Sequence, residues 1–349
     1  MPAPIRVLMI TSDWPDRASW GGTATFISRQ VDFLRAAGVD VDVFRFRGDG
    51  KPLRYAAAWL DVQRRLRRER YDLIHAQFGQ SGLLALPKQL PLVVTFRGDD
   101  LEGVLSNTTG RLTAQGRLLP LLSRVVARRA DATIVVSAHM KAFLPRAAQP
   151  HVIPSGLDLE RFRLIPQAEA RRHLGLAPDR RLVLFVGSPT SSRKRYDLAR
   201  RAVDIVGRSL PAELVLGWGV PHDQIPYYMN ACDALVFTSR QEGSPNVVKE
   251  ALACNLPVVS VAIGDVPERL RDLAGCEVCA DAEPDTIAAA LVRVLRRGER
   301  TASRERLRDL DEHVITARVI DVYRSVLAQT HSGAAGNRGR RVATAVGAP

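Results

Sequence analysis

Short runs of apolar residues alternate with stretches in which apolar residues recur at helical spacing. In the first half, the apolar runs predict strands at residues 5–10, 39–44, 72–75, 92–96 and 132–136. The helical spacing predicts helices at residues 23–37, 55–70 and 112–129, the last of which should kink or split at Pro120. Near-continuous apolar strands that alternate with helices are typical of a parallel sheet covered on both faces.

The second half of the chain repeats this plan. Its apolar runs predict strands at residues 181–186, 212–216, 234–237 and 257–261, and its helical patterns lie at residues 196–208, 246–254 and 284–297. A chain of 349 residues also exceeds the roughly 250–300 residues at which single cores stop growing. We therefore predict an α/β protein with two doubly wound domains, a linker around residues 151–166, and a ligand crevice between the domains.

Two carboxylates eight positions apart flank a tight turn in the second half. Glu242 precedes the turn, which Gly243, Ser244, Pro245 and Asn246 form, and Glu250 lies on the helix that follows. Free amides at a helix N-terminus favour anionic or hydroxyl-rich ligands, and carboxylates accept hydrogen bonds from sugar hydroxyls. The alternative is an ordinary strand-to-helix loop with a capping acid and a solvated Glu250.

The same segment resembles the E-x7-E motif of the retaining, nucleotide-sugar-dependent glycosyltransferases of family 4. The flanks at residues 229–236, 253–259 and 264–268 also resemble that family, and the similarity extends over residues 5–327. The resemblance implies the GT-B fold, in which two Rossmann-like domains face each other. It also implies that a final helix, at residues 312–328, crosses back to the first domain.

The resemblance sets the expected domains and donor contacts. We expect an acceptor-side domain at residues 1–155, a nucleotide-sugar domain at residues 156–311 and a disordered tail at residues 329–349. In this family the motif implies that Glu242 holds sugar hydroxyls, helped by the amides of Gly243 to Asn246, that Val247 also contacts the donor, and that Glu250 holds the ribose. No carboxylate cluster has metal-ligand spacing, and enzymes of this fold need no metal, so we expect neither metal nor cofactor.

Two glycines, Gly21 and Gly22, directly precede the first predicted helix. Glycine lets a backbone approach a ligand closely, and a helix N-terminus presents amides to phosphate. The dinucleotide fingerprint G-x-G-x-x-G is absent, which disfavours a nicotinamide dehydrogenase. A plain tight turn is the alternative, whereas in family 4 a matching glycine pair lies beside the donor diphosphate.

A loop of the second half carries three consecutive cations, Arg193, Lys194 and Arg195, at the start of a helix. Cations there oppose the helix dipole, so a bound dianion explains them better than stability does. Family 4 usually has an Arg just after the strand glycine and a Lys followed by Gly. Here Ser188 takes the place of that Arg and Arg195 that of the Gly, so we expect Arg193 and Lys194 to hold the diphosphate.

The ends of the first-domain strands supply candidates for the acceptor side. Arg97 stands where many family members carry a His near the transferred sugar, and it cannot be a general base because it stays protonated. It can bind a phosphate, a sugar hydroxyl or a carboxylate, or it can form a structural cluster with Asp99 and Asp100. Further candidates at strand ends are Asp13, His75, Gln77 and Asp99.

The chain is basic, with a formal net charge of +13, and residues 1–155 carry 22 Lys and Arg against 13 Asp and Glu. This excess favours a polyanionic neighbour such as anionic lipid, or else a solvated Arg-rich face. The predicted helix at residues 112–129 is basic and amphipathic, as helices that lie on lipid are, unless its leucines pack on the sheet. We expect a cytoplasmic protein without a signal peptide or spanning helix, associated with the inner face of the cell membrane.

We therefore predict a retaining glycosyltransferase that uses a UDP- or GDP-sugar in cell-envelope polysaccharide, glycolipid or secondary-metabolite biosynthesis. The acceptor would be a sugar, a lipid-linked intermediate or a small molecule. The alternatives are a nucleotide-sugar epimerase on the same fold and a non-catalytic sugar-nucleotide-binding or membrane-associated protein. Nucleic acid is disfavoured, because aromatic residues do not interleave with the basic runs.

Overall fold

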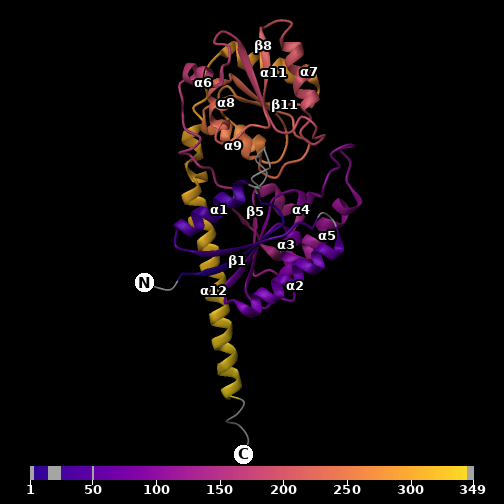
Figure 1. Cartoon of the computed structure of the whole chain (residues 1–349), viewed down its shortest axis with the longest axis vertical. Helices are drawn as coiled ribbons and strands as arrows, with labels where there is room; N and C mark the ends of the chain where they lie inside the picture. Colours follow the sequence, from indigo (N-terminus) through magenta and orange to yellow (C-terminus); the bar gives the residue numbers. More distant parts are fainter. Residues whose placement is uncertain (1–3, 15–24, 49–50, 344–349) are drawn as a thin grey trace, which may run out of the picture.

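The computed structural model describes residues 4–14, 25–48 and 51–343, with side chains up to residue 330. Residues 6–152 contain a parallel sheet that forms the centre of the lower unit in Figure 1. Its six strands are in the order β2-β1-β3-β4-β5-β6. Its strands are β1 (Arg6–Thr11), β2 (Asp40–Arg45), β3 (Leu73–Gln77), β4 (Leu92–Phe96), β5 (Ala132–Val135) and β6 (His151–Val152). The central strands are buried on both faces, as their unbroken apolar runs predict.

Helices cover both faces of this first sheet. They are α1 (Thr25–Ala36), α2 (Pro52–Arg68), α3 (Gly79–Gly82), α4 (Asp99–Glu102) and α5 (Ala114–Arg129). Short 3-10 helices lie at η1 (Leu83–Ala85), η2 (Ala138–Phe143) and η3 (Arg146–Ala148). Pro120 lies inside α5 and does not divide it, contrary to the predicted split.

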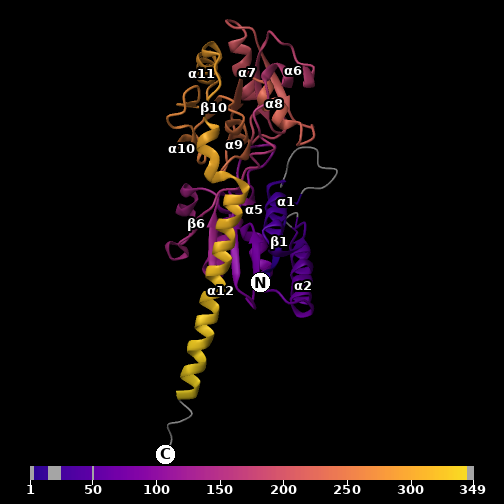
Figure 2. The ribbon, with the colours of Figure 1, turned by 90° about the vertical axis from the view of Figure 1, so that its left-hand side faces the viewer.

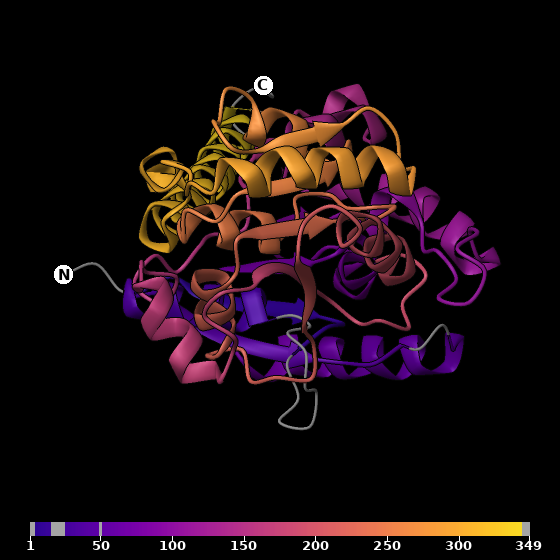
Figure 3. The same cartoon turned by 90° about the horizontal axis from the view of Figure 1, so that it is seen from above.

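Residues 181–279 contain a second parallel sheet, seen from above in Figure 3. Its five strands are in the order β11-β10-β9-β7-β8. The strands are β7 (Arg181–Val186), β8 (Ala212–Gly217), β9 (Ala234–Phe237), β10 (Val258–Val261) and β11 (Glu277–Cys279). The surrounding helices are α6 (Gln167–Leu174), α7 (Tyr196–Val206), α8 (Ile225–Ala231), α9 (Asn246–Ala253), α10 (Val266–Leu270), α11 (Pro284–Arg297) and the 3-10 helix η4 (Arg304–Leu310). Two separate α/β units therefore carry one sheet each.

The last helix, α12 (Glu312–Ala343), returns from the second unit and runs along the first (Figure 2). Its apolar face carries Ile315, Val319 and Tyr323, which are buried in the same core cluster as Val7 and Met9 of β1. The backbone is helical to Ala343, whereas the sequence pattern predicts a disordered tail from residue 329. Residues 329–343 contain three Ala and three Arg, which favour helix, and three Gly, which do not, so the extension depends on elongation from the packed part of α12, which adds one hydrogen bond per residue.

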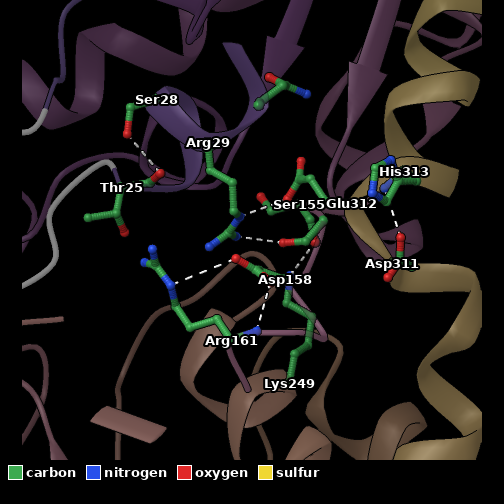
Figure 4. A network of polar contacts seen from close by, with 12 residues as sticks. Thr25, Ser28, Arg29, Ser155, Asp158, Arg161, Lys249, Asp311, Glu312 and His313 are labelled. Atoms are coloured by element: carbon green, nitrogen blue, oxygen red, sulfur yellow. Dashed lines mark hydrogen bonds and ion pairs between the residues drawn. The ribbon is translucent and has the colours of Figure 1, made fainter. Parts of the chain in front are cut away.

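Buried polar contacts join the two units where α12 begins (Figure 4). Arg29 of α1 forms an ion pair of 2.8 Å with Glu312, and it also donates to the carbonyl oxygen of Gly156 in the linker. Lys249 of α9, which is fully buried, donates to the carbonyl oxygen of Ser155 over 2.9 Å. These contacts set how the sheets face each other across the crevice.

Candidate active site

A cleft of about 540 Å³ lies between the two sheets, beyond the carboxyl ends of their strands. The first unit lines one side of it, which we call the N wall, with Asp13, Thr25, Phe26, Phe78, Arg97, Asp99, Asn107, Val136 and Ser155. The second unit lines the other side, the C wall, with residues of the β7–α7 loop, the loop after β8, residues 242–247 and Glu250. The predicted crevice between the domains is therefore present.

The carboxylate turn of the C wall follows the buried strand β9 and leads into α9, as the sequence predicts. Glu242 Oε1 lies 2.6 Å from Lys194 Nζ. Burial by itself would raise the pKa of Glu242, but Lys194 and Arg193 outweigh it and hold that pKa below its ordinary value. Glu242 is therefore an ionised acceptor at neutral pH, fixed by a cation of the neighbouring loop.

Two backbone amides of this turn are available to a ligand. Within the described part of the chain, no hydrogen bond engages the N–H groups of Gly243 and Ser244. Pro245 has no N–H to offer, which corrects the expectation that all amides from Gly243 to Asn246 contribute. The Ser244 hydroxyl donates to Asp265 over 2.8 Å, so it serves the fold.

The turn also lies tightly against the N wall. A Cβ atom on Gly243 would overlap the carbonyl oxygen of Arg97, and Gly98 opposite has a φ of +142°. Glycine is required on both sides because only a backbone without side chains fits this approach.

Glu250 lies one helical turn into α9, and 6% of it is exposed at the cleft. His222 lies beside it, with Nε2 at 3.8 Å from Glu250 Oε1. His222 Nδ1 accepts a hydrogen bond from Arg161 over 3.2 Å, so the proton is on Nε2, which faces Glu250. Glu250 is thus not the solvated surface residue of the alternative interpretation.

The β7–α7 loop brings the predicted cations to the cleft. Arg193 lies 3.2 Å from Asp99 of the N wall. Burial would lower the pKa of Arg193, but Glu242 and Asp99 outweigh it and raise that pKa. Arg195, the third cation, points away and donates to the carbonyl oxygens of Thr238 and Ser239.

The N wall contains three of the predicted acceptor-side residues. Asp13, Arg97 and Asp99 line the cleft. Burial raises the pKa of Asp13 and of Asp99 above the ordinary value for Asp. Arg97 does not form the structural cluster with Asp99 and Asp100, because Asp100 accepts the backbone N–H groups of Arg97, Gly98 and Gly79 instead.

Two of the candidates are not in the cleft. His75 is fully buried, and its ring nitrogens hydrogen-bond to Tyr323 of α12 and to Thr95. Burial lowers the pKa of His75 to about 3, so it is neutral. Gln77 is also fully buried, and its amide oxygen accepts from Arg97. We correct both predictions: residues two apart in a strand lie on the same face of the sheet, and on that face His75 contacts Tyr323 of α12 and Gln77 contacts Gln30 of α1, so neither reaches the crevice. Gly21 and Gly22 lie outside the described residues.

Other cleft residues were not predicted as part of the site. Trp218 directly follows β8 and His222 lies four residues further on, so the rule that ligands bind beyond strand ends could have found them. Ser155 of the linker also lines the cleft and accepts a hydrogen bond from Arg97 over 2.7 Å. Among residues 4–14, 25–48 and 51–343, no group of three or more His, Cys, Asp or Glu could hold a metal ion.

Two family profiles match the chain. "Glycosyltransferase Family 4" matches residues 20–161, and "Glycosyl transferases group 1" matches residues 183–297. A glycosyltransferase assigned to teichuronic acid biosynthesis in Bacillus subtilis is 29% identical over 220 residues, which is 56% of this chain and 54% of that protein. D-inositol 3-phosphate glycosyltransferase from Geodermatophilus obscurus is 28% identical over 281 residues, 66% of this chain and 60% of that protein. The chain thus matches little more than half the length of these relatives.

Solved structures share the fold at low sequence identity. Sucrose-phosphate synthase from Thermosynechococcus elongatus superposes with a TM-score of 0.77 at 19% identity, over 93% of this chain and all of that chain. Anabaena HepE, in complex with UDP-glucose, superposes with a TM-score of 0.67 at 18% identity, over 92% of this chain and all of that chain. Both α/β units and their arrangement are therefore those of the GT-B fold. The two profiles and the glycosyltransferase relatives together show that the chain belongs to glycosyltransferase family 4.

Proposed function

We propose that the protein is a retaining glycosyltransferase that transfers a hexosyl group from a nucleotide-diphospho-sugar to an acceptor hydroxyl. The C-wall arrangement carries this proposal: two carboxylates, two cations and the free amides of Gly243 and Ser244 converge on one cleft. A sugar with several hydroxyls attached to a diphosphate matches these groups in chemistry. A UDP-sugar is the first donor to test, because the similar fold of HepE carries UDP-glucose.

Each C-wall group has a role in the proposed donor complex. Arg193 and Lys194 bind the diphosphate and stabilise the negative charge that develops on it as the bond to the sugar breaks. Glu242, once Lys194 turns to phosphate, accepts hydrogen bonds from the sugar hydroxyls, and Glu250 accepts them from the ribose. Positive side chains at the leaving group make a divalent metal ion unnecessary in this proposal.

The acceptor approaches from the N wall in this scheme. Its hydroxyl oxygen attacks the anomeric carbon on the face that the diphosphate leaves, and its proton passes to a leaving phosphate oxygen, so retention needs no protein nucleophile. Asp13 is the carboxylate placed to orient an acceptor hydroxyl. The relatives' names include teichuronic acid biosynthesis and inositol 3-phosphate, which favours a cell-envelope or small-molecule acceptor for this chain.

A donor-binding panel tests the proposal. Thermal unfolding would be measured with UDP-, GDP-, ADP- and dTDP-sugars in the presence of EDTA. A donor at 100 times its Kd should stabilise the fold by about 2.7 kcal/mol. Stabilisation by one nucleotide class, followed by transfer from that donor, supports the proposal. A donor that binds and is isomerised without an acceptor would indicate the epimerase, and a donor that binds without any turnover the non-catalytic protein.

We also propose that α5 contacts anionic lipid. Leu118, Leu121 and Val125 are 54%, 54% and 43% exposed along one side of the helix, so these residues do not pack on the sheet. Five arginines and no acidic residue occupy residues 103–130, and they are Arg111, Arg117, Arg124, Arg128 and Arg129. Exposed leucines among cations suit the boundary between headgroups and acyl chains. No helix in the described part of the chain is long and apolar enough to cross a membrane.

Sedimentation with lipid vesicles tests this surface. The wild type should sediment with vesicles that contain phosphatidylglycerol and not with pure phosphatidylcholine. The double variant Leu118→Gln/Leu121→Gln should lose that binding, whereas Leu164→Gln, which changes a similarly exposed leucine in the linker, should keep it. Equal sedimentation of both variants would contradict the proposed contact.

A further inference from the structure

The cations of the cleft differ in how they are neutralised. Lys194 lies 2.6 Å from Glu242, and Arg193 lies 3.2 Å from Asp99. Arg97, in contrast, has no carboxylate oxygen within 4 Å among the described residues. Each of the four hydrogen bonds of its guanidinium goes to a neutral oxygen, and the acceptors are Gln77 Oε1 at 3.0 and 2.7 Å, Ser155 Oγ at 2.7 Å and Gln30 Oε1 at 3.3 Å.

Three separate elements hold the Arg97 guanidinium in place. Gln30 comes from α1, Gln77 from β3 and Ser155 from the linker, and the guanidinium lies 4.6 Å from the centre of the Phe26 ring. Gln77 also donates to Gln30 Oε1 over 2.9 Å, which keeps both amide oxygens turned towards Arg97. Neutral acceptors fix the orientation of a charged group without cancelling its charge.

Two of the three carboxylates that act on Arg97 are engaged elsewhere, and the third, Asp13, lines the cleft without forming an ion pair with Arg97. Asp100 accepts three backbone N–H groups, and Glu312 is paired with Arg29. Burial lowers the pKa of Arg97 to about 10, because these carboxylates do not fully compensate it. Charges taken out of water are normally paired, so an uncompensated cation in a cleft indicates that a ligand completes the pair.

The contacts leave hydrogen-bond donors for such a ligand. A guanidinium has five N–H groups, and the four bonds use one on Nε, one on Nη1 and two on Nη2. One Nη1 hydrogen remains, and the Ser155 hydroxyl hydrogen has no acceptor among the described residues. Arg97 and Ser155 both line the cleft and therefore present a cation with two donors.

The donor diphosphate does not account for this group. Arg193 and Lys194 already supply two cations on the C wall, whereas every hydrogen-bond partner of the Arg97 side chain belongs to the first unit or the linker. We propose that Arg97, together with Ser155, binds a carboxylate or phosphate carried by the transferred sugar or by the acceptor, so that the enzyme acts on an acidic sugar substrate. This inference rests on the proposed glycosyl transfer and names the substrate class of the same cleft.

Matched pairs of neutral and charged ligands test the inference. Donor affinity would be measured by calorimetry for UDP alone, UDP-glucose against UDP-glucuronic acid, and UDP-galactose against UDP-galacturonic acid. Acceptor affinity would be measured in the presence of UDP for inositol against inositol phosphate, and for glucose against glucuronic acid and glucose 6-phosphate. The proteins would be the wild type, Arg97→Gln, Arg97→Lys and the exposed control Arg180→Gln.

The wild type should prefer the charged member of at least one pair by about tenfold to a hundredfold, the range of a charge-assisted hydrogen bond. Arg97→Gln should abolish that preference and leave the affinities for UDP and for the neutral ligand within about twofold of the wild-type values. Arg97→Lys should keep part of the preference, because a point charge without the planar fork remains. Preference among donors assigns the charge to the transferred sugar, and preference among acceptors assigns it to the acceptor.

Two results would overturn the inference while the proposed function stands. One is UDP binding without any preference for a charged ligand across the panel. The other is that Arg97→Gln lowers the affinity for UDP as much as the affinity for the charged ligand, which would assign Arg97 to the diphosphate. Failure of the wild type to bind any nucleotide would instead contradict the proposed function, and the inference with it. Thermal unfolding of Arg97→Gln and Arg97→Lys shows first that both variants fold.

Discussion

The two walls of the cleft treat their cations differently. On the C wall, Lys194 has a carboxylate partner in Glu242, and Arg193 reaches across to Asp99. On the N wall, Arg97 is held by neutral oxygens alone. A paired cation can exchange its carboxylate for phosphate with little change in net charge, whereas an unpaired cation gains a partner it lacks. The comparison indicates that the C wall binds a diphosphate and that the N wall binds a second, separate anionic group.

The largest effect is expected from the C-wall carboxylate. Glu242→Gln should lower transfer by about 100-fold or more, because the amide keeps the shape and loses the charge-assisted contact to the sugar. Steady-state transfer from the preferred donor measures the effect. Glu213→Gln, on an exposed carboxylate of β8, should transfer like the wild type. A normal rate in Glu242→Gln would remove Glu242 from the site.

Removing Lys194, the partner of Glu242, should change how kcat/KM depends on pH. Lys194 and Arg193 hold the pKa of Glu242 below its ordinary value. In the wild type, Glu242 should therefore remain ionised even at a pH somewhat below about 4.3, the pKa of a free Glu side chain. Lys194→Met should lower kcat/KM by about tenfold to a hundredfold and move its acid limb to higher pH. The pH profile of kcat/KM checks this. An acid limb that stays in place would show that Lys194 does not set the charge of Glu242.

A stability effect is expected at the contact that joins the walls. Burial lowers the pKa of Lys249 to about 7, and the charged groups around it are Arg269, Asp265, Arg29 and Glu250. From pH 7 to about 10.4, the value of a free Lys, the unfolded chain binds a proton that the folded chain does not. The free energy of unfolding should therefore gain up to about 1.4 kcal/mol per pH unit from this group as pH rises.

Lys249→Met isolates this contribution, since Met fills similar space without a charge. Urea unfolding of both proteins between pH 7 and pH 10 measures this contribution. The free energy of unfolding of the wild type, minus that of the variant, should increase as pH rises. Parallel curves would show that Lys249 stays charged when buried.

The smallest effect is expected from the ion pair across the cleft. Asp99 is 46% exposed at its side chain, so its pair with Arg193 contributes at most about 1 kcal/mol. Asp99→Asn should leave folding intact and strengthen UDP binding by about fivefold at most, because Arg193 no longer has a competing carboxylate. Calorimetry at low and high salt checks this, and weakened UDP binding would mean that Asp99 positions Arg193 instead.

The two walls also differ in how far the sequence predicts them. Glu242, Arg193 and Lys194 lie on two strand-to-helix loops and Glu250 lies on the helix after one of them, where a local pattern and a family resemblance both indicate the cleft. The doubly wound fold follows in the same way from strands such as β7, whose apolar run matches its bounds. On the N wall, the partners of Arg97 come from positions 30, 77 and 155, and no local spacing joins them. His75 was misplaced because a strand end does not reveal which face a side chain takes.

Titration of UDP into Lys194→Met and Arg97→Gln tests the division between the walls most directly. The account predicts that Lys194→Met lowers the affinity for UDP by about tenfold or more, whereas Arg97→Gln leaves the affinity for UDP within about twofold of the wild-type value. The opposite result, weak UDP binding in Arg97→Gln and normal binding in Lys194→Met, would contradict the account and place the diphosphate on the N wall.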